Sequence, residues 1–547
     1  MRLHTRYSVV VVTLLVTSAT LIAHMQAQVP LQPKSTAGAL SAEEQAFRDA
    51  LALKDPDAKL RAFQKLLQVW PHSPAVKNGA ADFNILQLTT TMTAQAAKEA
   101  RRAAEAFAAT IPSDDRDRAA WQNMLLAMAF ARTDVMWPEA ERYSHRALAY
   151  WDSGGTNEAP KGNGLALERA VPLTVLGQSI AKQGRDADAE PYLREAYERR
   201  ADEPGVVGQV VPLLLDIARR RGRSNEQQQY LIALALHGQL TPELRTELEE
   251  AYRRTHPGSQ VGLEAALDRA YEAELPKAIP VEAFTRTPAE GRRTVLTEMF
   301  TGASCGPCLG MNFAIEAAMR RYELRDSAVL VYHLHSPAPD PLVSPSGKAR
   351  AKAYGVNGAP HVFVDGVVLD DEGGGKASEA AAIFRSRLQP AVDGALGNAP
   401  AARISLKAAQ KDDVIRASVV VDQVPSDVPG LRLHVALAED RVRYSGGNGI
   451  RFHPMVVRKM AGDGQGLAIS GKSLRTQVVF DVASVRRELQ AYLEDFEKRG
   501  DEHFGPSAFK EKSYDIDPSR LVVVAFVEEA RSHRVLQAAV MRAAGRQ

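Results

Sequence analysis

The chain of 547 residues contains two cysteines, Cys305 and Cys308, separated by one glycine and Pro307. The apolar run Thr294–Phe300 before them reads as a strand, and Leu309–Tyr322 after them has the pattern of a helix. Free N–H groups and the macrodipole at a helix start favour a thiolate, which is the nucleophile in disulfide exchange. Pro307 suits the first helical turn because the N–H it lacks would have no helical partner. The spacing predicts a redox pair with the first sulfur exposed and the second one turn inside the helix.

Two other interpretations of this pair stay open. A zinc site needs four ligands, and with no further cysteine in the chain only His333 and His335 on the next predicted strand could complete one. The alternation of a strand also explains these two histidines as members of one face. A purely structural disulfide would close a very short loop and would therefore add little stability by loop entropy.

The Cys-Gly-Pro-Cys motif and a second segment, YGVNGAPHVFVDG at residues 354–366, together resemble the thioredoxin superfamily over about Val295–Val392. The resemblance implies an α/β domain in which Cys305 attacks and Cys308 resolves the mixed disulfide.

In that family the proline at the position of Pro360 is cis, begins a strand and faces the active site. Ala359 and Pro360 are accordingly expected to contact the backbone of a substrate. Glu298 is the candidate proton relay to the resolving thiol, although strand alternation turns it to the opposite face from Met299, which aligns with the family's buried acid.

A wider resemblance links residues 298–308, Asp340-Pro341-Leu342 and residues 436–444 to envelope-associated thioredoxin-like proteins named after an outer-membrane protein of Bacteroidetes. Besides Met299, two positions depart from the superfamily pattern. Ser304 stands where thioredoxin has a tryptophan, and Phe313 stands where a helix-kinking proline is expected.

Residues 41–275 are rich in Ala, Leu, Glu, Arg and Gln, with apolar residues at helical spacing, and predict a helical array. One unit resembles a tetratricopeptide repeat, in which small residues let paired helices approach closely. Its residues are Leu176, Gly177, Gly184, Ala189, Leu193 and Ala196. A solenoid of degenerate helix pairs is the preferred interpretation, and a compact all-helical domain is the alternative.

The length predicts several domains. After a proline-containing linker at 276–293, strands alternate with helices over 294–398, which predicts an α/β domain. From 400 to 547, period-two patterns predict a separate β-sandwich. The fold expected is therefore multidomain: an all-α tetratricopeptide-like solenoid, an α/β thioredoxin-like domain, and a β-sandwich. Further expected strands are 328–335, 361–365, 414–422, 477–482, 521–527 and 535–541, with helices at 379–388 and 485–498.

Residues 1–27 begin with Arg2 and Arg6, continue without charge, and resemble a secretory signal peptide, with an uncleaved anchor as the alternative. Residues 28–40 read as a polar linker. The expected location is the bacterial periplasm or envelope. With 68 basic and 66 acidic residues, the charge gives no indication of nucleic-acid binding.

The preferred functional hypothesis is an exported thiol:disulfide oxidoreductase that acts on protein thiols or disulfides, with a protein or peptide held in the groove of the repeats. It needs no cofactor or metal, and the sequence does not identify its electron donor or its redox direction. The alternative is a non-catalytic envelope scaffold or binding protein with a vestigial thioredoxin-like domain.

Overall fold

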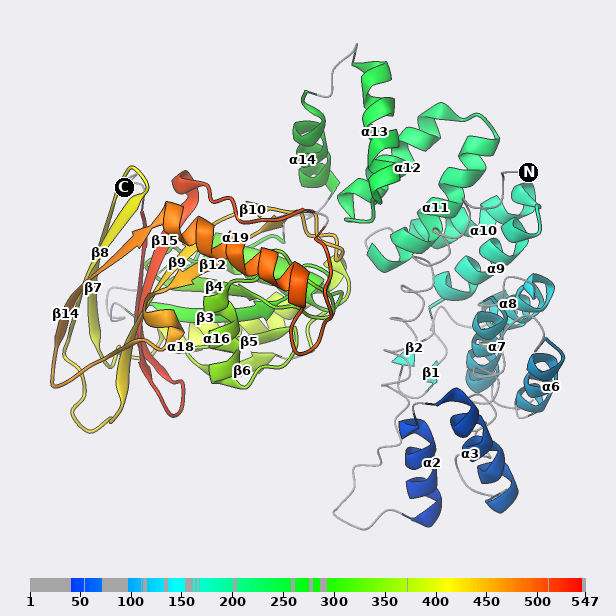
Figure 1. The fold of residues 1–547 in the computed structure, drawn as a ribbon, viewed down its shortest axis with the longest axis horizontal. Helices are drawn as coiled ribbons and strands as arrows, with labels where there is room; N and C mark the ends of the chain where they lie inside the picture. Colours follow the sequence, from blue (N-terminus) through cyan, green and yellow to red (C-terminus); the bar gives the residue numbers. More distant parts are fainter. Residues whose placement is uncertain are drawn as a thin grey trace. The chain divides into compact units, whose positions relative to one another are not determined.

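The computed structural model describes residues 41–53, 55–70, 97–109, 111, 116–131, 136–152, 161–162, 165–166, 168–199, 204–256, 261–274, 279–285, 293–370, 372–509 and 511–543. The expected export segment and the linker 28–40 lie outside these residues, as does most of the linker 276–293. The protein is multidomain, with helices in its N-terminal half and a mixed sheet with further sheets in its C-terminal half (Figure 1). None of the described helices combines the length and the apolar character needed to cross a membrane.

The chain divides into two compact units, unit 1 with residues 1–201 and 205–230 and unit 2 with residues 202–204 and 231–547. The described elements of unit 1 are helices apart from one short hairpin that the sequence analysis does not predict. They are α2 (Ala42–Ala52), α3 (Pro56–Val69), α6 (Ala97–Ala108), α7 (Arg116–Ala131), α8 (Trp137–Asp152), β1 (Lys161–Gly162), β2 (Leu165–Ala166), α9 (Ala170–Lys182), α10 (Asp186–Arg199), α11 (Pro204–Arg220) and α12 (Ser224–Leu236), which belongs to unit 2 from Leu231 onward.

Helices α9 and α10 form the pair in which the sequence shows its repeat-like residues. A Cβ added to Gly177 would lie 2.6 Å from Leu193 Cγ, so a glycine is needed where the two helices approach. Gly184 takes a left-handed φ of 79° in the turn between them, a conformation that glycine adopts without strain. The small residues therefore act here as the sequence analysis expects.

Glu190 of α10 joins this pair of helices to the next through arginines. It lies 2.7 Å from Arg194, 2.9 Å from Arg221 and 2.6 Å from Arg223, and its side chain is 11% exposed. The hydrogen bond from Arg223 is the main reason that the pKa of Glu190 falls to about 2. This carboxylate is therefore a cross-link between consecutive helix pairs.

Unit 2 also contains the end of the helical segment, which is expected to extend to residue 275. Helix α14 (Leu263–Glu274), which follows α13 (Pro242–Thr255), is tied to the C-terminal half of the chain by ion pairs. Arg451 contacts Glu264 at 2.5 Å and Asp268 at 2.6 Å. Because Arg451 is 3% exposed in its side chain, these acids compensate a buried charge.

The remaining elements of unit 2 alternate helices and strands before residue 400 and are mostly strands after it. They are β3 (Val295–Thr301), α15 (Cys308–Arg321), β4 (Ser327–His333), α16 (Pro345–Tyr354), β5 (His361–Val364), β6 (Val367–Asp370), η2 (Ala377–Glu379), α17 (Ala380–Ile383), η3 (Phe384–Leu388), α18 (Gln389–Leu396), β7 (Arg403–Lys411), β8 (Val414–Asp422), β9 (Leu431–Glu439), β10 (Val442–Arg443), β11 (Phe452–His453), β12 (Val456–Met460), η4 (Ala461–Gly464), β13 (Leu467–Ala468), β14 (Leu474–Asp481), α19 (Val482–Arg499), η5 (Pro518–Arg520), β15 (Leu521–Glu529) and β16 (Val535–Arg542).

One mixed sheet runs through both segments of unit 2, in the order β16-β15-β9-β12-β4-β3-β5-β6, with β13 beside β9. The parallel pairing of β12 with β4, at Val456 and Val331, joins the strands that follow residue 400 to those before it. The β-sandwich expected at 400–547 is therefore not a separate domain. Its strands β7, β8 and β14 form a second, three-stranded sheet, at one side of unit 2 in Figure 1.

Strand β15 is buried on both faces and separates two hydrophobic cores. Val524 and Phe526 pack into the core around β3, β4 and α15. Val523 and Val527 pack into the core formed with β8, β14 and α19. Since successive side chains of a strand point to opposite faces, this single strand supports both cores.

A buried arginine, Arg350 of α16, joins β3 to β15. It donates to Glu298 of β3 at 2.9 and 2.8 Å and lies 2.6 Å from Glu528 of β15. Tyr332 and Tyr354 donate to the same Glu298 carboxylate at 2.8 and 2.6 Å. Burial by itself raises the pKa of Glu298, but the charge and hydrogen bonds of Arg350 outweigh it and lower this pKa below its usual value.

The first prediction concerns the acid stability of unit 1. The pKa of Glu190 is lower in the folded chain than in the unfolded chain, where it is 4.5, so the ionised carboxylate stabilises unit 1 at pH values above 4.5. This contribution is lost as the pH falls towards 2. Glu190→Gln should lower the urea midpoint at neutral pH and flatten its decline between pH ~5 and ~2. Tryptophan fluorescence reports this unit, because all four tryptophans lie in it, at positions 70, 121, 137 and 151.

The control is Glu198→Gln, which changes an exposed carboxylate on the same helix. Its urea midpoint should follow that of the unsubstituted protein at every pH. Equal acid sensitivity of the Glu190→Gln and unsubstituted proteins would contradict the role given to Glu190.

The second prediction concerns the buried arginine. Arg350→Met leaves Glu298 and Glu528 in the interior without their shared cation, which should cost roughly 3–5 kcal/mol. Hydrogen exchange in peptides covering β3 and β15, followed at increasing urea, measures the local free energy of opening. Arg325→Met, at an arginine whose side chain is 73% exposed, should stay within about 0.5 kcal/mol of the unsubstituted protein. Unchanged exchange in Arg350→Met would show that the pairing does not stabilise the sheet.

Candidate functional site

Cys305 and Cys308 form a disulfide where β3 leads into α15, with their Cα atoms 5.3 Å apart. The turn between them is closed by hydrogen bonds from Cys308 N to Cys305 O and from Leu309 N to the following carbonyl, that of Gly306. Helix α15 begins at Cys308, with Pro307 directly before it as its N-cap. The predicted placement of the pair at the start of a helix is confirmed.

The predicted exposure of the first sulfur is wrong for this disulfide form. Cys305 is 1% exposed and Cys308 is 0% exposed, so the whole pair is buried. Gly306 in the turn between them is exposed and Pro307 is half-buried. Two segments distant in sequence bind the backbone around the pair.

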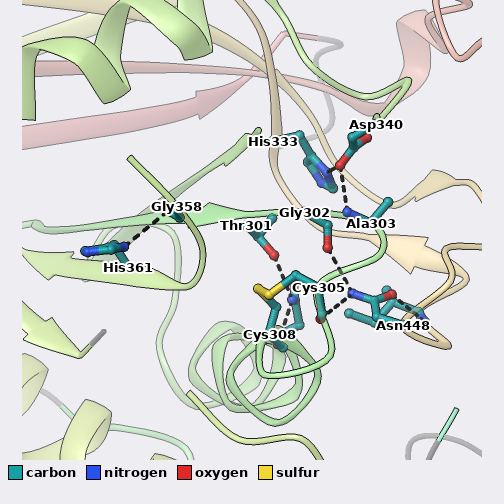
Figure 2. The surroundings of a disulfide bond; sticks show 12 residues. Thr301, Gly302, Ala303, Cys305, Cys308, His333, Asp340, Gly358, His361 and Asn448 are labelled. Atoms are coloured by element: carbon teal, nitrogen blue, oxygen red, sulfur yellow. Dashed lines mark hydrogen bonds and ion pairs between the residues drawn. A yellow bond between two sulfur atoms is a disulfide. The ribbon is translucent and has the colours of Figure 1, made fainter. Parts of the chain in front are cut away.

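The first of these segments follows β10 and carries Asn448. The side-chain amide of Asn448 donates to Gly302 O at 3.1 Å and to Cys305 O at 3.3 Å (Figure 2). The backbone N–H of Asn448 donates to Ala303 O at 3.0 Å. One buried residue therefore binds the backbone of the loop from β3 to the cysteine pair.

The second segment is the glycine run 373–375. Gly374 N donates to Pro307 O at 2.7 Å, and Gly374 O accepts from Gly310 N at 2.7 Å. A Cβ on Gly373 would lie 2.2 Å from Pro307 O and 2.6 Å from Pro360 Cγ. This glycine thus fits between the cysteine turn and Pro360, where no side chain would have room.

The structure places Pro360 across Gly373 from the cysteine turn, while the expected contact of Ala359 and Pro360 with a substrate stays a prediction. The Ala359–Pro360 peptide bond is cis, Pro360 is buried, and β5 begins at the next residue. A second cis bond, Ser336–Pro337, lies in the loop after β4 and is not anticipated by the sequence analysis.

Glu298 lacks the position of a proton relay. Parallel pairing places Glu298 and Phe300 on one face of β3, and Thr301, which accepts from Asn312 of α15, on the other. The carboxylate of Glu298 is bound to Arg350 and two tyrosines on the face turned away from α15. The expectation that it serves Cys308 is therefore wrong, because its hydrogen bonds and its face belong to the core around α16.

The two histidines considered as zinc ligands are engaged by other groups. His333 Nδ1 lies 2.7 Å from Asp340 Oδ2, an oxygen that also accepts from Ala303 N at 2.6 Å. His335 accepts from Asp340 N and contacts the Tyr492 hydroxyl. In the part of the chain that the structure describes, no group of three His, Cys, Asp or Glu side chains is arranged to hold a metal ion.

Asp340 is a second fixed point of the loop before Cys305. Burial alone raises the pKa of Asp340. The charge and hydrogen bond of His333 and the N–H groups of Ala303 and Leu342 outweigh burial, so this pKa lies below its usual value. The sequence points to Asp340 only through the wider resemblance, and it gives no indication of a role for Asn448. Glycines on both sides of Asn448 predict a tight loop, but they do not reveal what that loop contacts.

Comparisons with known proteins identify no family. No family model matches the chain, and no curated protein matches it. A solved structure that resembles it, HBP35 of Porphyromonas gingivalis, is 19% identical over 46% of this chain and 76% of the other, with a TM-score of 0.32. A score this low bears on neither the fold nor the activity.

Proposed function

We propose that the protein is an exported thiol:disulfide oxidoreductase whose redox couple is Cys305 and Cys308. The observation that carries the proposal is the disulfide at the junction of β3 and α15, with cis-Pro360 across Gly373 from the same turn. The strands support a thioredoxin-like arrangement, because β3 lies between parallel β4 and antiparallel β5.

In the proposed reaction the reduced pair acts on a protein disulfide. The thiolate of Cys305 attacks one sulfur of the partner, which releases the other as a thiolate. Cys308 then attacks Cys305, which forms the bond present in the structure and releases the second partner thiol. Two electrons pass to the partner, and the reverse sequence oxidises a partner dithiol.

The other parts of the chain supply binding surfaces in this proposal. Unit 1 is a tetratricopeptide-like array that holds a protein or peptide, and the close approach of α9 and α10 at Gly177 supports it. The sheet formed by β7, β8 and β14 completes a sandwich with β9 and β15 around a shared core. Export to the bacterial envelope rests on the N-terminal segment with Arg2 and Arg6.

A second function, a non-catalytic envelope scaffold, is favoured by one observation. Cys305 is 1% exposed, whereas an attacking cysteine has to meet its partner. In this alternative the disulfide is structural, and its reduction potential should lie below about −300 mV, out of reach of the surrounding thiol pool.

The third prediction separates the two functions by trapping. Cys308→Ser keeps the attacking thiol but removes the resolving one, so mixed disulfides with envelope proteins should accumulate on non-reducing gels. Cys305→Ser should form none, and the double substitution is the control for non-specific adducts. If neither single variant traps a partner and the potential lies below about −300 mV, the scaffold function replaces the oxidoreductase.

A further inference from the structure

The tip of the β10–β11 hairpin, residues 445–450, is a compact loop that we name the cover segment. It is closed on itself by hydrogen bonds from Gly446 N to Ile450 O and from Gly449 N to Gly446 O. Asn448 Oδ1 also accepts from Ile450 N at 3.1 Å. The loop therefore has a shape of its own and meets the cysteine turn as a formed element.

The inner side of the cover segment fits the backbone that leads to Cys305. Asn448 makes three hydrogen bonds to this backbone, at Gly302, Ala303 and Cys305. The glycines of the cover segment approach the same backbone closely. A Cβ on Gly446 would lie 2.4 Å from Ala303 O, and one on Gly447 would lie 3.1 Å from Ser304 Oγ. Asn448 itself is 1% exposed, so this contact excludes water.

The outer side of the cover segment is held by residues that directly follow α12. Gln239 Nε2 donates to Gly447 O at 2.9 Å. Gly238, with a left-handed φ of 67°, approaches so closely that an added Cβ would lie 1.9 Å from Gly446 O. The cover segment is thus clamped between residues 238–239 and the loop before Cys305.

We propose that the cover segment controls access to the redox pair, and that Asn448 and Gln239 are positioning residues that keep it closed. The partner's reacting cysteine reaches the Cys305 sulfur when the cover segment moves away, and breaking the bonds of Asn448 to Gly302 O and Cys305 O is part of that motion. This proposal rests on the proposed function, because control of access serves a purpose only if the pair reacts with a partner. Access to the Cys305 sulfur can nevertheless be measured without any protein partner.

Dithiothreitol is a suitable probe, because it supplies both electrons and both protons needed to reduce the disulfide. Its thiolate attacks the Cys305 sulfur and displaces the Cys308 thiolate. Its second thiol then displaces Cys305 and closes a cyclic disulfide, which leaves both cysteines as thiols. The rate in the folded chain thus reports how often the sulfur is reachable.

The fourth prediction is the order of these rates in the full chain. Asn448→Ala, which removes two buried hydrogen bonds to the loop, should speed reduction by about ten- to thirtyfold. Gln239→Ala, which removes one bond on the outer side and contacts neither cysteine, should speed it by about three- to fivefold. Asn398→Ala is the matched control, since this asparagine is exposed and its side chain donates to Gly394 O, within its own helical segment. Its rate should equal that of the unsubstituted protein.

Hydrogen exchange in β3 and β15 distinguishes opening of the cover segment from general unfolding and should be the same in all four proteins. If Asn448→Ala disturbs these strands, Gln239→Ala decides the test. The proposal is overturned if the folded unsubstituted protein is reduced as fast as in urea, or if the deciding variant reacts at the control rate. If the variants are reduced faster but Cys308→Ser traps no partner, the cover segment still controls access and the oxidoreductase function is rejected. The failure of one proposal can therefore be told from the failure of the other.

Discussion

The ion pair that Arg350 makes with Glu298 and Glu528 is the constraint on which unit 2 depends. Three charged side chains, each at most 2% exposed, are taken from water, and their mutual contacts are the main compensation for that loss. The three residues come from β3, α16 and β15, so the pairing holds only when strands far apart in sequence are already together. Glu298, which a motif-based interpretation assigns to proton transfer, is thereby a structural residue.

Local sequence patterns predict the elements of unit 2 well and their assembly poorly. The strand expected at 414–422 matches β8, and the helix expected at 309–322 differs from α15 by one residue at each end. Helix α16 is missed, although Ser344 before a proline and Gly355 after Tyr354 are ordinary start and stop signals. Alternation reveals which side chains are buried but not which strand is the neighbour, so the pairing of β12 with β4 could not be foreseen.

The sequence likewise predicts the local features of the candidate site but not its contacts with distant parts of the chain. The cysteine spacing and the segment around Pro360 identify the pair and the proline across Gly373 from its turn, because those features are local. The backbone of Cys305 is bound by Asn448, 143 residues later, from a loop whose glycines are compatible with many contacts. Nothing in the residues around the cysteines predicts that another part of the chain would occupy the space beside them.

Strand β15 gives unit 2 a fixed order of completion. Its even-numbered side chains close the core around β3 and its odd-numbered ones close the core around β8, while Glu528 supplies the second acid of Arg350. A chain that leaves the ribosome from its N-terminus therefore carries both cores unfinished until β15, at Leu521–Glu529, has emerged. Until then β9 has an exposed edge, which makes the unfinished chain a client for holding chaperones rather than a set of domains that fold one after another.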